Sequence, residues 1–352
     1  MKIVVAPDSF KGCCTAQEAA TALRQGVSEI LPDAEVLTVP LADGGEGTTC
    51  VLVSSLQGQW SPLELGFDAL LRPVRTHYGY LPSTGQVVME AAETIGLPRL
   101  KKEEYNPIQA SSYGLGYQLV QACDAGYRHF LIGLGGTATC DGGKGMLRAI
   151  RERFGSAIPS IKIDVLCDVN NPLFGPQGAA CIFAPQKGAN PDEIVQLDQN
   201  LRAMAVGEKA RFAQLPGAGA GGGLGFALAA YLDANLLQGS KKILEILHFN
   251  EKISDADLII TGEGKMDGQT LCAKLPSGVL KAAMRQSIPV VGVAGKVEQQ
   301  DALLRQGFLR IYPVNPPGIP DEMALQTDYA LSRLTLTAKQ ICKDVLLGKN
   351  NC

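Results

Sequence analysis

The sequence has few of the residues and spacings that mark metal and redox proteins. It holds only three histidines, His77, His129 and His248, and ten cysteines, none of them in a CxxC pair. Zinc and redox motifs need such spacings. We therefore interpret the histidines as structural and most cysteines as small, buried apolar residues. The adjacent pair Cys13 and Cys14 leaves a redox role open.

Long apolar runs and an excess of one charge are also missing. No apolar segment approaches the ~18 residues of a membrane span, and the start, MKIVVAPDSFKG, lacks the layout of a signal peptide. The net charge is only −3, whereas binding to nucleic acid or to an anionic membrane usually requires a basic surface. We expect a cytoplasmic protein with small-molecule ligands and with neither nucleic acid nor membrane as a partner. The oligomeric state stays open, and a homo-oligomer is compatible with the sequence.

Glycine, in contrast, is abundant: 40 of the 352 residues are glycine, clustered between apolar runs. A chain of this length is expected to form two domains. Strands and helices alternate at both ends of the chain, beginning with the strand KIVVA and a helix after Thr15, which has a capping-box spacing to Glu18. The alternation resumes at DLIIT (257–261), PVVGVAG and FLRIYPV.

These patterns predict an α/β protein with two domains. Residues 1–72 and 257–352 are predicted to form one doubly wound, Rossmann- or flavodoxin-like domain around a parallel sheet. Residues 73–256 mix strands and helices less regularly, and we predict that they form an inserted α/β domain with a mixed sheet.

Four loops that follow predicted strands combine glycines with carboxylates, hydroxyls or a lysine: PDSFKG, ADGGEGT, GLGGTATCDGG and TGEGKMDGQT. In an open parallel sheet such loops collect at the carboxyl ends of the strands, where ligands bind. Glycine allows successive N–H groups to turn toward an anion. A carboxylate beside a phosphate is repelled by it, unless a cation such as Mg²⁺ lies between them or the carboxylate is there to accept a proton. These are the components of phosphoryl transfer.

Other interpretations of these segments remain open. PDSFKG fits an ordinary turn with Asp8 in an Asx turn as well as a loop in which Lys11 binds an anion. The glycine run PGAGAGGGLGF (216–226) is either a phosphate cradle or a flexible hinge, because it matches neither a Walker A loop nor GxGxxG after a strand. The lack of GxGxxG followed by an acid also disfavours a nicotinamide dehydrogenase.

Taken together, the motifs resemble those of the bacterial glycerate kinases, the ATP-dependent type I glycerate 2-kinase family. The matching segments run in order from residue 3 to about 295 and include APDSFKG, ADGGEGT, GLGGTATCDGG, CDVNNPLFGPQGAA, PGAGAGGGLG and ADLIITGEGK. The resemblance implies phosphorylation of D-glycerate to 2-phosphoglycerate with ATP and Mg²⁺. The sequence departs from the family pattern at Cys13, Cys14, Cys140 and Lys144, and at Lys265, where arginine is common.

The loops and the resemblance together give a set of candidate residues. For the catalytic base we favour Asp43 or Asp267, and for the charge of the γ-phosphate Lys11 or Lys265. The alternatives are a kinase for another small hydroxy or sugar acid, or a non-catalytic sugar-acid sensor. Candidates for binding substrate or nucleotide are Asp8, Ser9, Gly44, Gly45, Gly47, Thr48, Gly135, Gly136, Thr137, Lys187, Gly219, Gly221 and Gly222; candidate metal ligands are Glu46, Asp141, Asp168 and Glu263.

Overall fold

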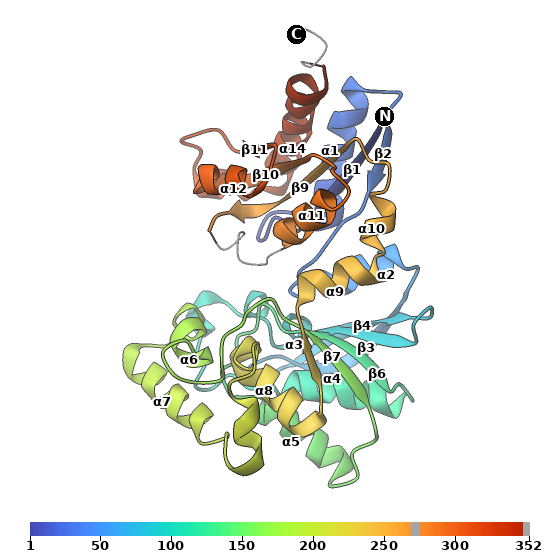
Figure 1. The fold of residues 1–352 in the computed structure, drawn as a ribbon. Helices are drawn as coiled ribbons and strands as arrows, with labels where there is room; N and C mark the ends of the chain where they lie inside the picture. Colours follow the sequence, from blue (N-terminus) through green and yellow to red (C-terminus); the bar gives the residue numbers. More distant parts are fainter. Residues whose placement is uncertain (269–274, 348–352) are drawn as a thin grey trace. The chain divides into compact units, whose positions relative to one another are not determined.

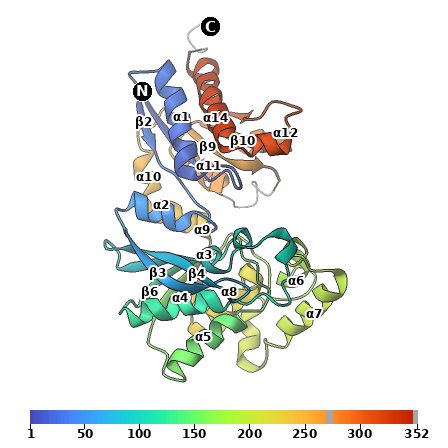
Figure 2. The same cartoon turned by 180° about the vertical axis from the view of Figure 1, so that it is seen from behind.

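The computed structural model describes residues 1–268 and 275–347, which fall into two compact units (Figures 1 and 2). Unit 1 consists of Met1–Asp43 and Ser240–Cys352, and unit 2 is Gly44–Gly239. Unit 1 contains a parallel sheet and unit 2 a mixed sheet. The predicted fold class is therefore confirmed.

The boundaries of the two units differ from those expected from the sequence. The first falls between residues 43 and 44 instead of 72 and 73, and the second between 239 and 240 instead of 256 and 257. The reason is that helix α2 (Thr48–Ser55) and strand β3 (Gln59–Phe67) pack with the second sheet, whereas α9 (Gly239–Ile246) and α10 (Phe249–Lys252) belong almost entirely to unit 1.

The sheet of unit 1 has five parallel strands in the order β11-β10-β9-β1-β2. When the five strands are numbered by their sequence within this unit, the order is the flavodoxin-like 2-1-3-4-5. Successive strands are added on one side of β1 and then, from β9 onward, on the other side, so the switch point lies between β1 and β9. Ligands of such sheets bind at the carboxyl ends of the strands beside this switch point. The strands are β1 (Lys2–Pro7), β2 (Glu35–Thr38), β9 (Leu258–Met266), β10 (Val290–Val297) and β11 (Arg310–Pro313).

Helices cover both faces of this sheet. Because side chains alternate along a strand, Ile3 and Val5 pack on one face beneath α1 (Ala16–Ile30) and α14 (Thr327–Ile341). Helix α11 (Leu275–Met284) contacts β9 and β10 and lies in front of the sheet in Figure 1. The remaining elements of the unit are α12 (Gln300–Gln306), α13 (Asp321–Ala324) and a π-helical turn at Cys342–Leu347.

Strand β9 is longer than the sequence suggests. The segment TGEGKMDGQT was expected to be a loop from its first residue, but residues 262–266 continue the strand and pair with β10. The glycines are tolerated in the strand because their backbone groups pair with those of β10. At Gly262 glycine is also required, since an added Cβ would lie 2.1 Å from the carbonyl oxygen of Val293. Glu263 and Lys265 therefore project from a strand. The last two residues of the motif, 269 and 270, lie outside the described residues.

The sheet of unit 2 has six strands in the order β3-β4-β5-β6-β7-β8. β3, β4 and β5 pair antiparallel, whereas β5 to β8 are parallel, so the carboxyl ends of β5, β6 and β7 share one edge. The sequence did not predict the β3–β4 hairpin. The further strands are β4 (Pro73–Leu81), β5 (Gln86–Glu90), β6 (His129–Gly133), β7 (Lys162–Leu166) and β8 (Asn235–Leu237).

The main core of unit 2 lies between this sheet and three helices. Phe130 and Ile132 of β6 pack in one cluster with Leu119, Met146 and Leu228 from α4, α5 and α8. Helix α2 contacts β4 and β5. The helices are α3 (Ala91–Ile95), α4 (Tyr113–Asp124), α5 (Lys144–Phe154), α6 (Ala179–Phe183), α7 (Pro191–Arg202) and α8 (Ala220–Leu232), with 3₁₀ turns at Leu97–Arg99, Lys102–Glu104, Pro185–Lys187 and Gly207–Phe212.

Across residues 1–268 and 275–347, no helix is both long enough and apolar enough to cross a membrane.

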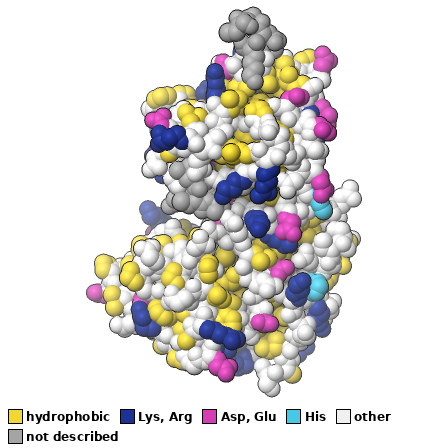
Figure 3. Space-filling model, viewed as in Figure 1, with side chains coloured by type: hydrophobic (Ala, Val, Ile, Leu, Met, Phe, Trp, Pro, Cys, Tyr) yellow, Lys and Arg dark blue, Asp and Glu magenta, His cyan; other side chains and the backbone are white. Residues whose placement is uncertain are grey.

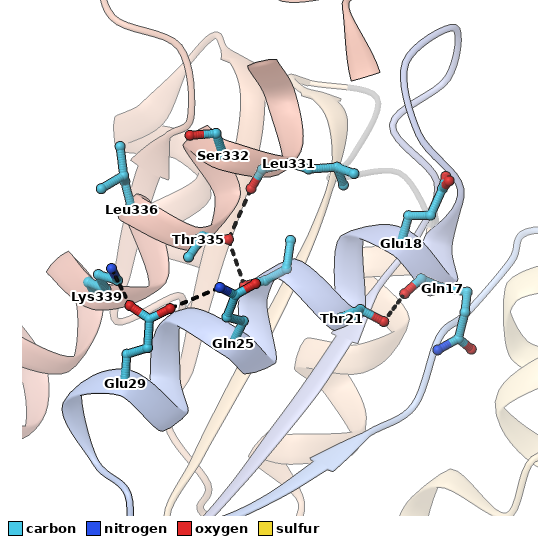
Figure 4. Close-up of a pocket in the computed structure, with 11 residues that line it drawn as sticks. Gln17, Glu18, Thr21, Gln25, Glu29, Leu331, Ser332, Thr335, Leu336 and Lys339 are labelled. Atoms are coloured by element: carbon cyan, nitrogen blue, oxygen red, sulfur yellow. Dashed lines mark hydrogen bonds and ion pairs between the residues drawn. The ribbon is translucent and has the colours of Figure 1, made fainter. Parts of the chain in front are cut away.

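Helices α1 and α14 approach each other closely, as Figure 4 shows for the shallow groove along their outer surface. The Thr335 hydroxyl donates to the carbonyl oxygen of Ala22 at 3.1 Å, and Lys339 forms an ion pair with Glu29. Beneath this contact, a Cβ added to Gly26 would lie 2.2 Å from the carbonyl oxygen of Thr335. The interface therefore has no room for a side chain at position 26.

We predict that Gly26→Leu forces α1 and α14 apart and lowers the free energy of unfolding by ~3 kcal/mol, the upper end of the usual cost of overpacking. Urea denaturation followed by circular dichroism measures this change. Arg24→Ala, an exposed position on the same helix, is the control and should change stability by less than about 0.5 kcal/mol. Equal urea midpoints for the two variants would contradict the prediction, because they would show that the α1–α14 interface can accommodate a side chain at position 26.

Candidate functional site

In unit 1, four of the candidate side chains lie at the switch point of the sheet. Asp8 and Lys11 are in the loop after β1, Asp43 ends the segment after β2, and Glu263 is on β9. The Lys11 ammonium lies 3.3 Å from the Asp43 carboxylate; the Lys11 side chain is 60% exposed and that of Asp43 20%. We call Asp8, Lys11, Asp43 and Glu263 the switch-point cluster. The first three come from loops that the sequence predicted to converge.

Like charges crowd this cluster. Asp8 is only 4% exposed, and its burial, followed by repulsion from Asp43, raises its pKa well above the usual 3.8. The backbone N–H of Ser9 donates to the Asp8 carboxylate at 2.6 Å, which opposes the shift only in part. The pKa of Lys11 is also raised, chiefly by Asp43, so Lys11 remains charged. The cluster can therefore present one exposed cation and accept either a proton or a further cation.

The other two catalytic candidates are Lys265, farther along β9, and Asp267, just after the strand ends. The Lys265 ammonium is 3.2 Å from the Asp267 carboxylate and 3.1 Å from that of Glu298, a residue that the sequence analysis did not select. Lys296, also not selected, contacts the same Glu298 at 3.2 Å. These two lysines face each other in register on β9 and β10. Attraction to Glu298, followed by Asp267, raises the pKa of Lys265.

In unit 2, the glycines of the ADGGEGT loop lie over the carboxyl ends of the sheet strands. A Cβ on Gly133, at the end of β6, would lie 2.3 Å from the carbonyl oxygen of Gly44, and one on Gly135 would lie 2.5 Å from the Cα of Gly45. Added to Gly44, a Cβ would lie 2.8 Å from that of Leu166, at the end of β7. Backbone therefore packs directly on backbone here, which only glycine permits.

Glu90 holds the other end of the ADGGEGT loop in place. Its carboxylate accepts hydrogen bonds from the backbone N–H groups of Gly47 at 3.0 Å and Thr49 at 2.5 Å. Thr48 between them is buried, and its hydroxyl has no hydrogen-bond partner within the described part of the chain. Burial raises the pKa of Glu90. The sequence analysis missed Glu90; the available signal was an acid that ends the apolar strand QVVME.

Lys187 supports the GLGGTATCDGG loop from below. Its ammonium donates to the Thr137 hydroxyl at 3.1 Å and to the carbonyl oxygen of Thr139 at 2.7 Å, and the residue is 3% exposed. Burial lowers the pKa of Lys187 to about 8. Lys187 thus contacts the loop, with little surface left for a ligand. Gly136 precedes Thr137 and adopts a positive φ of 72°.

The glycine run near residue 220 packs against the same loop. Gly221, Gly222 and Gly223 adopt positive φ angles of 61°, 72° and 93°. A Cβ on Gly222 would lie 2.0 Å from the carbonyl oxygen of Thr139. The N–H of Gly219, just before the turn, donates to the carbonyl oxygen of Asn171 at 2.9 Å. Close packing therefore accounts for this run, in addition to the two roles considered from the sequence.

The four candidate metal ligands occupy different settings. Asp141 accepts four hydrogen bonds, from the N–H and hydroxyl of Ser112 and the N–H groups of Gly143 and Gly145, which engage both of its oxygens. Glu46 is exposed, and Asp168 and Glu263 are partly exposed. In residues 1–268 and 275–347 no group of three or more His, Cys, Asp or Glu side chains could hold a metal ion. Mg²⁺ needs only one or two carboxylates when phosphate oxygens supply other ligands.

The face of the molecule drawn in Figure 3 has no large patch of one charge. In Figure 3, positive and negative side chains are interspersed on the visible face. An anionic ligand must therefore be recognised by local geometry, and the switch-point cluster and the glycine loops provide it.

A parallel sheet with charged groups at its switch point, joined to a second α/β unit with glycine loops at its strand ends, is an arrangement suited to phosphoryl transfer. The model of the Glycerate kinase family matches residues 3–157 and 151–346. The chain therefore belongs to the glycerate kinase family, as the sequence motifs suggested, and is a kinase.

Individual relatives are similar over nearly their full length. The chain is 37% identical to a glycerate kinase of Bacillus subtilis (strain 168), with 99% of each chain covered. It is 38% identical to the glycerate 2-kinase of Escherichia coli (strain K12), over 87% of this chain and 88% of that one. Among solved structures, the one named for glycerate kinase 2 of Salmonella typhimurium LT2 superposes with a TM-score of 0.81 at 36% identity, covering 99% of both chains.

The buried, repelled Asp8 yields a prediction about stability. A carboxyl whose pKa is higher in the folded than in the unfolded state destabilises the fold once pH exceeds the unfolded value. Asp8→Asn should therefore raise the free energy of unfolding at pH 7 by roughly 1–3 kcal/mol, as expected when a poorly paired buried group is relieved. The gain should shrink as pH falls toward 4 and vanish below it, because Asp8 is then protonated in both states.

Urea denaturation of both proteins between pH 3.5 and 8, with EDTA present, measures this difference. Asp33→Asn, at an exposed position of the same unit, should give no comparable pH-dependent gain. If Asp8→Asn were less stable than the unchanged protein at pH 7, the carboxylate would have to be stabilised by its surroundings, contrary to this interpretation.

Proposed function

We propose that the protein transfers the γ-phosphoryl group of ATP to the 2-hydroxyl of D-glycerate, giving 2-phosphoglycerate and ADP. The observation that carries the proposal is the switch-point cluster: an exposed ammonium, Lys11, paired at 3.3 Å with a partly exposed carboxylate, Asp43. Membership of the glycerate kinase family and the names of the relatives support glycerate as the acceptor.

Asp43 and Lys11 have complementary roles in this mechanism. The Asp43 carboxylate accepts the proton of the attacking hydroxyl, and Lys11, kept protonated by Asp43, neutralises charge on the transferred phosphoryl group. Asp43 is preferred to Asp267 because Asp43 belongs to the switch-point cluster, whereas Asp267 lies beyond the end of β9. Lys265 and Lys296 supply further positive charge beside the same strand ends.

The same carboxylates fit Mg²⁺. Asp43 and Glu263 both repel Asp8, and a hard divalent cation that prefers oxygen ligands relieves such repulsion. Glu263, on β9, is the residue that we expect to hold Mg²⁺. When bound, Mg²⁺ neutralises charge on the phosphate oxygens.

The glycine loops of unit 2 supply backbone N–H groups for an anion. Glu90 and Lys187 fix these loops from beneath through the bonds described above. We propose that these loops bind an anionic group, because fixed N–H groups stabilise negative charge without having to reorganise.

The direct test of this function is release of ADP in the presence of ATP and Mg²⁺, with and without D-glycerate. We expect ADP release to depend on D-glycerate and Mg²⁺ together, and to be at least tenfold slower with L-glycerate or with a larger sugar acid. A faster reaction with another hydroxy acid would reassign the substrate. Ligand binding without turnover of any acid would favour the sensor.

The two candidate bases can be separated by substitution. Asp43→Asn should lower kcat about 10²–10⁴-fold, the usual contribution of general base catalysis, and change the KM values for ATP and D-glycerate little. Asp267→Asn is the matched control and should lower kcat by less than tenfold. The opposite pattern, with kcat lost in Asp267→Asn and retained in Asp43→Asn, would assign the base to Asp267.

A further inference from the structure

Unit 1 contains a cavity of about 710 Å³ that the proposed mechanism does not by itself explain. It lies at the carboxyl ends of β1, β9, β10 and β11, beside α13. One part is lined by residues of the switch-point cluster, and the rest extends away from them along the loop 313–319. All the lining residues belong to unit 1.

The volume is too large for a three-carbon acid alone. Cavities of roughly 300–1,000 Å³ hold ligands the size of a drug or a nucleotide. Glycerate also has almost no apolar surface to bury, whereas much of this cavity is apolar. A second, larger ligand is therefore needed to account for it.

One wall of the cavity is suited to a mostly apolar group. It is formed by the loop 313–319 and by α13, and Leu325, which is 50% exposed, lies there. A ligand that covered Leu325 would bury its apolar surface. The apolar lining residues are Val297, Pro313, Val314, Pro316, Pro317, Ile319, Ala324 and Leu325.

This wall also contains an acceptor without a partner. The side-chain amide of Asn315 donates through Nδ2 to the carbonyl oxygen of Gly295 at 3.2 Å, which fixes its orientation. Its oxygen, Oδ1, is buried and has no hydrogen-bond partner within residues 1–268 and 275–347. An unmade hydrogen bond of this kind is unfavourable, and an N–H donor on a bound heterocycle would supply it.

Three ammonium groups also reach the cavity, together with the carboxylates of Asp8 and Glu263. Lys11, Lys265 and Lys296 all line it, and their side chains are 60%, 47% and 71% exposed. An apolar compartment joined to a group of exposed ammonium ions matches a base joined to a chain of phosphates.

We infer that this cavity is the nucleotide site, with the purine against the loop 313–319 and α13, and the phosphates directed toward Lys11, Lys265 and Lys296. The inference rests on the proposed function, because it takes ATP to be the phosphoryl donor. It assigns the nucleotide to unit 1 and identifies Lys296, Asn315 and Leu325 as residues that contact it.

Cys13 provides a readout that needs no turnover. It lines the cavity and is partly exposed, whereas its neighbour Cys14 is buried, with a pKa raised by burial to about 12. Cys50 is exposed on α2 of unit 2 and serves as the internal control. We propose labelling the unmodified protein with N-ethylmaleimide at pH 8 and measuring the rate at each cysteine by peptide mass spectrometry.

Saturating ATP or ADP should slow labelling of Cys13 at least tenfold and leave Cys50 unchanged, while D-glycerate alone should protect neither. Unchanged labelling of Cys13 with saturating nucleotide would overturn the inference, and so would protection by D-glycerate alone. Because no reaction is measured, protection by nucleotide would stand even if glycerate were not phosphorylated.

A pair of leucine variants tests the apolar wall in the reacting enzyme. Leu325→Ala should raise KM for ATP about fivefold, as expected for loss of part of an apolar ligand contact, without changing KM for D-glycerate. Leu336→Ala, an equally exposed leucine on α14 outside the cavity, should change neither constant. Activity with an unchanged KM for ATP in Leu325→Ala would contradict the placement of the purine while leaving the kinase reaction intact.

Discussion

Repulsion among carboxylates at one end of a parallel sheet is the constraint on which the rest of the site depends. Asp8 is buried beside Asp43, with Glu263 close enough to add to the repulsion, and Lys11 is the cation that offsets it. The fold is not stabilised by such an arrangement, because a buried carboxylate with a raised pKa costs free energy at neutral pH. The metal ion proposed for this site would offset the cost, because a cation relieves repulsion among carboxylates.

The second unit meets a different constraint, that of close backbone contact. Gly44, Gly133 and Gly135 lie where any Cβ would clash with neighbouring backbone or Cβ atoms. Glu90 and Lys187 then anchor the loops through buried hydrogen bonds. The result is a set of loops whose N–H groups are fixed in advance, which is the condition for stabilising a developing negative charge. The two units thus differ in kind: unit 1 has charged side chains and a large cavity, and unit 2 has fixed backbone loops.

Much of this arrangement could be predicted from the sequence because glycines and acids follow apolar strands at regular points. The fold class follows from that pattern, as does the placing of the loops with Lys11 and Asp43 at strand ends, whereas the family follows from the resemblance of the motifs. The β3–β4 hairpin could not be recognised, since Pro62 and Gly66 interrupt its alternation and much of β3 is exposed. The length of β9 was missed because glycines suggested a loop, whereas pairing with β10 keeps the chain extended. Glu298 and Asn315 act through tertiary contacts that no local motif marks, and Glu90 had only the weak signal of an acid at the end of an apolar strand.

The most direct measurement of the central claim is ³¹P nuclear magnetic resonance of the protein incubated with ATP, Mg²⁺ and D-glycerate, with a second sample that lacks glycerate. The account predicts a phosphomonoester signal coupled to the single proton on carbon 2, which identifies 2-phosphoglycerate, together with ADP in equal amount. A signal coupled to the two protons on carbon 3 would contradict the proposed position of transfer. Absence of any glycerate-dependent product would contradict the function itself.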